Sequence, residues 1–77
     1  MTHVFFHCSS GNGVLLDQRG SYLDDPVDAR DYGERFVRHL ISRPGPEDWR
    51  DWTLHVSDEE GDELIVVPFA SLLGRPN

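Results

Sequence analysis

The stretch HCSSGNGVLL, residues 7–16, decides the fold because it combines a strand, a tight turn and a returning strand. Its centre is rich in glycine and asparagine, which tolerate the positive φ values that tight turns need. The stretch HVSDEEGDELIV, residues 55–66, repeats the same order with acidic residues in its turn. The sequence therefore predicts two β-hairpins.

A helix signature lies between the two hairpins. Asp25 and Pro26 are typical of a helix N-cap and first turn, and Pro44 and Pro46 are expected to end the helix. Gly33 would cost about 1 kcal/mol relative to alanine inside a helix, which we interpret as room for a close approach to a sheet. The residues that recur at helical spacing are Ala29, Tyr32, Gly33, Phe36, Val37, Leu40 and Ile41.

These elements predict an α+β fold in the order β-β-α-β-β, with an antiparallel sheet of about four strands and one helix packed on one face. We expect a single small domain over residues 1–77, of which residues 70–77 form a short terminal turn and tail. Strand and helix periodicity together predict one core cluster between sheet and helix. Its expected members are Phe6, Leu15 or Val14, Tyr32, Phe36, Leu40, Leu54, Val56 and Val66.

The composition narrows the function classes. The net charge is −7, and all seven basic residues are arginine. An excess of acid disfavours general nucleic-acid binding, because that affinity comes mostly from neutralised phosphates. The lone Cys8 cannot form an internal disulfide. There is no signal-peptide pattern and no apolar run of membrane-spanning length, so we expect a cytoplasmic protein without membrane contact.

Several short motifs occur in a characteristic order. They are Phe5-Phe6-His7, Asp17-x-x-Gly20 and Val67-Pro68-Phe69-Ala70. Together they resemble a family of small, uncharacterised, mainly alphaproteobacterial domains of unknown function, which open with a Phe-Phe-His strand and close with Pro-Phe-Ala. The resemblance implies the domain boundaries and brings no established activity with it.

The histidines are the first candidates for chemistry. His3 and His7 lie about 13 Å apart along one strand, too far to bind one metal ion together. His7 and His55 would meet if their strands pair, and Asp17 or Asp58 would then be the third ligand. The simpler interpretation is imidazoles on a sheet face, and we therefore predict no metal and no cofactor.

Three further features have simple structural explanations. Cys8 alternates with apolar residues, so we expect it to face the core rather than to act as a nucleophile beside a histidine. The acidic stretch 58–63 lacks the spacing of an EF-hand loop and is expected to be a solvated turn. A candidate basic strip on the outer side of the helix consists of Arg35, Arg38 and Arg43.

One helix covers only one face of such a sheet, so the other face is expected to carry an apolar patch. The candidate interaction surface is Phe5, His7, His55, Ile65 and Val67. We therefore expect a non-enzymatic protein-interaction or regulatory module that forms a homodimer, and the identity of any protein partner stays open. The alternatives are a nucleic-acid-associated regulator or an acidic nucleic-acid mimic, and then a small enzyme or metal-binding domain.

Overall fold

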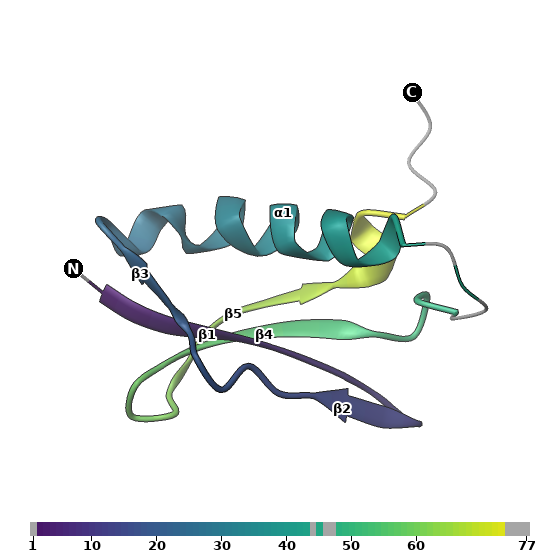
Figure 1. Cartoon of the computed structure of the whole chain (residues 1–77), viewed down its shortest axis with the longest axis horizontal. Coiled ribbons are helices and arrows are strands. Elements are labelled where there is room, and N and C mark those ends of the chain that lie inside the picture. Colours follow the sequence, from purple (N-terminus) through teal and green to yellow (C-terminus); the bar gives the residue numbers. More distant parts are fainter. Residues whose placement is uncertain (1, 44, 46–47, 74–77) are drawn as a thin grey trace.

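The structure is a computed structural model that describes residues 2–43, 45 and 48–73. A helix lies across one face of an antiparallel sheet (Figure 1), so the predicted α+β fold is confirmed. In the described ranges, no helix is long and apolar enough to span a membrane. The elements are β1 (Thr2–Ser10), β2 (Gly13–Leu15), β3 (Ser21–Leu23), the 3₁₀ turn η1 (Pro26–Asp28), α1 (Ala29–Ile41), β4 (Thr53–Asp58), β5 (Glu63–Pro68) and the 3₁₀ turn η2 (Phe69–Ser71).

The sheet has the order β2-β1-β4-β5, and β3 also pairs with β1. β2 pairs with the end of β1 and β3 with its beginning, where Val4 lies opposite Ser21. These two short strands therefore line the same edge of β1, separated by residues 16–20. The first strands of the two hairpins pair with each other at the centre of the sheet, which places His7 opposite His55.

Asp25 and Pro26 begin the helical region as predicted, but they cap and open the 3₁₀ turn η1, and α1 itself begins at Ala29 without a side-chain cap. The Asp25 Oδ1 atom accepts the Val27 N–H at 3.0 Å, and Pro26 occupies the first turn of η1. The close approach expected at Gly33 is also confirmed, because a Cβ atom there would lie 2.7 Å from Leu54 Cδ2. The buried helix residues are Ala29, Gly33, Val37 and Leu40, which form one narrow stripe.

The core lies between this stripe and the helix-facing side of the sheet. Phe69 is fully buried, and Trp49 and Trp52 lie against it with ring centroids 5.9 and 6.4 Å away. The buried apolar residues are Val4, Phe6, Cys8, Leu23, Ala29, Val37, Leu40, Leu54, Val56, Val67 and Phe69. The predicted tail is described as far as residue 73, and residues 74–77 lie outside the described residues.

Four of the eight expected core positions are wrong, because both alternatives for one position, Leu15 and Val14, are exposed, and so are Tyr32, Phe36 and Val66. The strand errors come from register and position: Val66 pairs with His55 on the side away from the helix, and β2 is a short edge strand. Tyr32 and Phe36 were mispredicted because we expected a wider buried stripe on the helix than the structure shows. Phe36 lies at its margin, where its ring stacks on Phe6 with centroids 6.0 Å apart.

Candidate functional site

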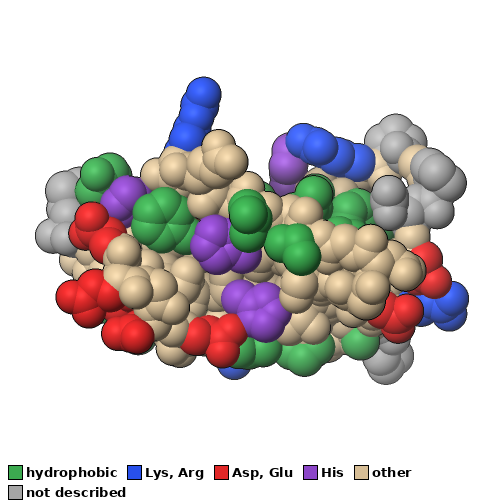
Figure 2. Space-filling model, turned by 90° about the horizontal axis from the view of Figure 1, so that it is seen from below, with side chains coloured by type: hydrophobic (Ala, Val, Ile, Leu, Met, Phe, Trp, Pro, Cys, Tyr) green, Lys and Arg blue, Asp and Glu red, His purple; other side chains and the backbone are tan. Residues whose placement is uncertain are grey.

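We call the side of the sheet away from α1 the outer face (Figure 1). Strand alternation and register place a set of ring-bearing and aliphatic residues on it: His3, Phe5, His7, Val14, Tyr22, His55 and Val66. Figure 2 shows this side of the molecule, where histidine and hydrophobic side chains lie next to one another and acidic side chains gather toward the ends. Aromatic, imidazole and aliphatic groups thus share one surface.

The candidate interaction surface of the sequence is partly wrong. Phe5, His7 and His55 lie on the outer face as expected, but Ile65 and Val67 lie on the helix side. Val67 is only 2% exposed and pairs with the buried Leu54. The cause is strand periodicity: in an apolar run, alternate residues face opposite sides, and a shift by one residue exchanges the sides.

Four rings form a row on the outer face along β1. His3 stacks on Tyr22 with centroids 4.3 Å apart and an interplanar angle of 12°. On its other side, His3 lies 4.6 Å from Phe5, and Phe5 is parallel to His7 at 6.0 Å. Stacking holds the rings in place, and Tyr22, the first ring of the row, is 65% exposed.

Hydrogen bonds fix the orientation of two of these imidazoles. His7 Nδ1 accepts the Asp17 N–H at 3.0 Å. The neutral ring therefore carries its proton on Nε2, because only one ring nitrogen is protonated in neutral imidazole. His3 Nε2 donates to the Arg19 carbonyl oxygen at 2.9 Å. His7 thus presents an N–H donor to solvent rather than a free lone pair for a metal.

His55 lies between an acid and a hydroxyl group, and we call these three side chains the Ser9 relay. This arrangement was not predicted from the sequence. The Nδ1 atom of His55 contacts Glu63 Oε1, and its Nε2 atom lies 3.0 Å from Ser9 Oγ. The order acid, imidazole, hydroxyl is that of a Ser–His–acid triad, which makes Ser9 a candidate nucleophile. Residues 9, 55 and 63 have no recognisable spacing, and only the pairing of β1, β4 and β5 brings them together.

Asp17 supports this part of the sheet from the loop between β2 and β3. Its carboxylate accepts the backbone N–H groups of Phe6 at 3.1 Å, Arg19 at 3.1 Å and Gly20 at 3.0 Å. Burial raises the pKa of Asp17, but hydrogen bonds from Gly20, Phe6 and Arg19 and the nearby His7 outweigh it, and the pKa lies below its usual value. The loop is therefore built around a charged carboxylate.

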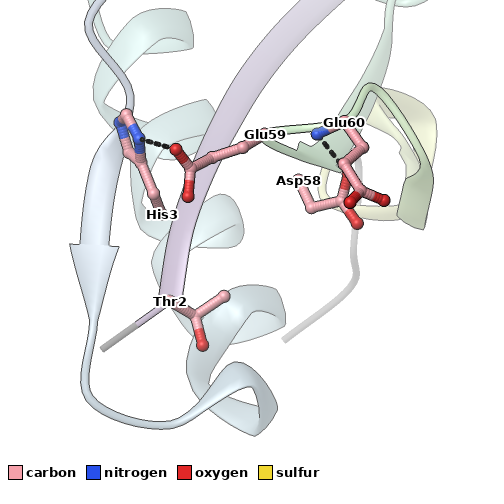
Figure 3. A pocket seen from close by; sticks show the side chains of 5 residues that line it. All are labelled: Thr2, His3, Asp58, Glu59 and Glu60. Atoms are coloured by element: carbon pink, nitrogen blue, oxygen red, sulfur yellow. Dashed lines mark hydrogen bonds and ion pairs between the residues drawn. The ribbon is translucent and has the colours of Figure 1, made fainter.

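An open cavity of about 300 Å³ lies beside His3, the second ring of the row. It is lined by Thr2, His3, Asp58, Glu59 and Glu60 (Figure 3). The Glu59 side chain points across it to His3, with Glu59 Oε2 3.6 Å from His3 Nδ1. Three of the five lining residues are acids, so the cavity suits a cationic group.

His7 and His55 lie opposite each other, but among the described residues neither belongs to a group of three ligand atoms close enough to hold one metal ion. In the described part of the chain, the ligand-atom cluster is Asp58, Glu60 and Asp62, whose oxygens lie within 4.8 Å of one another. Asp58 Oδ1 accepts the N–H groups of Glu60 at 2.9 Å and Asp62 at 3.0 Å. This carboxylate closes the hairpin turn, so the cluster has a structural explanation without a metal.

The basic strip is interrupted by acids. Arg35, Arg38 and Arg43 are all exposed. Arg35 pairs with Asp31 at 3.3 Å and Arg38 with Glu34 at 3.9 Å, both one helical turn apart. These pairs offset much of the positive charge that a phosphate backbone would meet.

Cys8 lies in the core, as expected. Its side chain is fully buried beside the helix-facing residues of β1. Burial raises the pKa of the Cys8 thiol to about 11. The thiol is therefore protonated at neutral pH and points away from the histidines of the outer face.

The comparison with known protein families gives one match. Residues 3–70 match the family described as "Domain of unknown function (DUF6894)". No curated protein matches the chain, and no solved structure matches it. The match covers most of the chain, so the chain belongs to this family of unknown function, as the motif order predicted.

Proposed function

We propose that this domain is a non-enzymatic protein-interaction or regulatory module that binds its partner through the outer face. The supporting observation is the exposure of large apolar side chains there: Tyr22 is 65%, Val14 59% and Val66 44% exposed. Leaving apolar surface in water is unfavourable, and several large exposed apolar side chains on one face favour a contact surface. A partner that covers the face would remove these groups from water.

We also propose that the chain forms a homodimer through the open edge of β5. β5 is the last strand in the sheet order, so the backbone groups on its far edge are available to pair with another strand. Two copies joined there by a two-fold axis would extend the sheet. Such a dimer leaves the outer face accessible, and sedimentation equilibrium of the chain alone would show the doubled mass.

Site-specific photo-crosslinking tests the use of the outer face. A photoreactive phenylalanine analogue is placed at Val66 on the outer face, or at Val27 in η1 as a matched control. Both positions carry an exposed valine. In cells that express the chain, we expect adducts with a second protein from position 66 and none from position 27. Equal yields from the two positions, or no adduct from position 66, would contradict the proposal.

A further inference from the structure

We infer that the partner of the outer face presents a basic segment, and that one of its arginine or lysine side chains enters the cavity beside His3. This inference rests on the proposed function and names the chemistry of the partner. It combines two observations: the charge distribution around the face and the stacked rings that lead into the cavity.

The charge is unevenly distributed along the molecule. The stretch 58–63 contains five acidic residues and no basic residue. In α1, by contrast, arginines alternate with acids and pair with them, as in Arg30–Glu34 and Arg35–Asp31. The acidic hairpin therefore brings unbalanced negative charge to one end of the outer face. A concave surface lined by charges of one sign concentrates ions of the opposite sign.

The rings supply the second part of the recognition. His3 belongs both to the stacked row and to the wall of the cavity, so the two features are continuous. Its stacking partner Tyr22 is exposed, and a guanidinium or ammonium group is attracted to the face of such a ring. A basic segment along the row would therefore place cations over Tyr22 and beside the Glu59 carboxylate in the cavity.

The volume of the cavity and its negative charge favour an arginine or lysine side chain over other occupants. A volume of about 300 Å³ suits one long side chain rather than a folded element. Nucleic acid carries the same sign of charge as the hairpin and is repelled. A second copy packed on the outer face would bring another chain of net charge −7 to this surface. A basic segment is attracted by the negative charge that disfavours nucleic acid and a second copy. It is also the partner that an acidic nucleic-acid mimic would bind.

Fluorescence anisotropy with a labelled oligoarginine peptide tests the charge requirement at low ionic strength. We expect binding that weakens with added salt, and no binding of a labelled oligoglutamate peptide. The double variant Glu59→Gln/Glu60→Gln should weaken binding about fivefold, because exposed ion pairs contribute up to about 1 kcal/mol each. The matched control Asp31→Asn/Glu34→Gln changes the net charge equally but lies on the helix, and should change binding less than about twofold.

A second matched pair tests the role of the rings. Tyr22→Ser removes the exposed ring of the outer face and should weaken oligoarginine binding about threefold, as expected for an exposed cation–π contact. Tyr32→Ser removes an exposed ring from the helix and should leave binding unchanged. Circular dichroism melts of all four variants check that each is folded under the binding conditions.

Each remaining outcome overturns the inference. Absence of oligoarginine binding would refute the basic partner, and equal losses in the hairpin and helix variants would show only non-specific attraction. A dimer that shields Val66 from crosslinking would assign the face to a second copy. Crosslinks from position 66 without oligoarginine binding would refute this inference while leaving the proposed function standing, whereas absence of crosslinks would refute the function itself.

Discussion

Asp17 Oδ2 accepts the backbone N–H of Phe6 at 3.1 Å, at a point on the edge of β1 that neither β2 nor β3 reaches. Val4 pairs with β3 and Cys8 with β2, and Phe6 lies between them. The carboxylate thus takes the place of a strand carbonyl along this edge. The same side chain holds the N–H groups of Arg19 and Gly20, so one residue closes the gap and shapes the loop.

Removing this carboxylate should destabilise the domain. We expect Asp17→Ala to lower the free energy of unfolding by about 2 kcal/mol, because a partly buried N–H loses its partner. Urea denaturation followed by circular dichroism measures the change. Asp24→Ala is the control, since Asp24 is exposed, and similar losses in the two variants would contradict the role of Asp17.

The contribution of Asp17 should also depend on pH. The pKa of Asp17 is lowered in the folded state, so its stabilisation is fully present above the unfolded value of about 3.9. It is lost as the pH falls through the lower folded value. The stability difference between the wild type and Asp17→Asn should therefore be constant near neutral pH and shrink in acid. A constant difference down to the acid limit would refute a charged Asp17.

Gly20 should not tolerate a side chain. Its φ is +72°, and a Cβ atom there would lie 2.7 Å from the Val4 carbonyl oxygen. Gly61 has a φ of +87° but nothing within 4 Å, so Gly61→Ala measures the backbone strain alone. We expect Gly20→Ala to cost about 1–3 kcal/mol more than Gly61→Ala, the usual range for an overpacked site. Thermal unfolding of the two variants tests the difference.

Burial sets the cost of removing aromatic rings. Phe36 is 38% exposed, so Phe36→Ala should cost about 1–2 kcal/mol, since only part of the ring leaves water on folding. Phe69 is fully buried, and Phe69→Ala should cost about 3–5 kcal/mol. Chemical denaturation provides both values. A larger loss at Phe36 than at Phe69 would contradict the arrangement of the core.

We predict that His7 and His55 do not bind zinc tightly. His7 Nδ1 accepts the Asp17 N–H, and both nitrogens of His55 have protein partners. Equilibrium dialysis against zinc followed by elemental analysis tests this prediction, with His39→Ala as a control on the exposed helix. Stoichiometric zinc that disappears in His7→Ala/His55→Ala would contradict it and would favour the metal-binding alternative.

We predict no esterase turnover from the Ser9 relay. The His55 and Glu63 side chains are 34% and 49% exposed, so water competes with the relay and screens its charges. Hydrolysis of p-nitrophenyl acetate should therefore be the same for the wild type and Ser9→Ala. A rate that depends on Ser9, His55 and Glu63 together would instead support the small-enzyme alternative.

Local patterns in the sequence determined the two hairpins, the helix and their order, but not the short strand β3. The Gly-rich and acidic turns define two hairpins, and Asp25 with Pro26 defines the start of the helical region, because turn and cap chemistry acts over a few neighbouring residues. The alternation of Cys8 with apolar residues correctly predicted that Cys8 faces the core, for the same reason. These features depend on residues that are neighbours in the sequence, so they could be predicted without the tertiary structure.

Only the tertiary structure decided which residues meet across strands. Ile65, Val66 and Val67 are equally apolar, and the pairing of β5 with β4 alone assigns Val66 to the outer face and Val67 to the core. Ser9, His55 and Glu63 come together for the same reason, as do His3 and Glu59 at the cavity. Register is a property of two strands at once, so it becomes fixed when the buried face is packed.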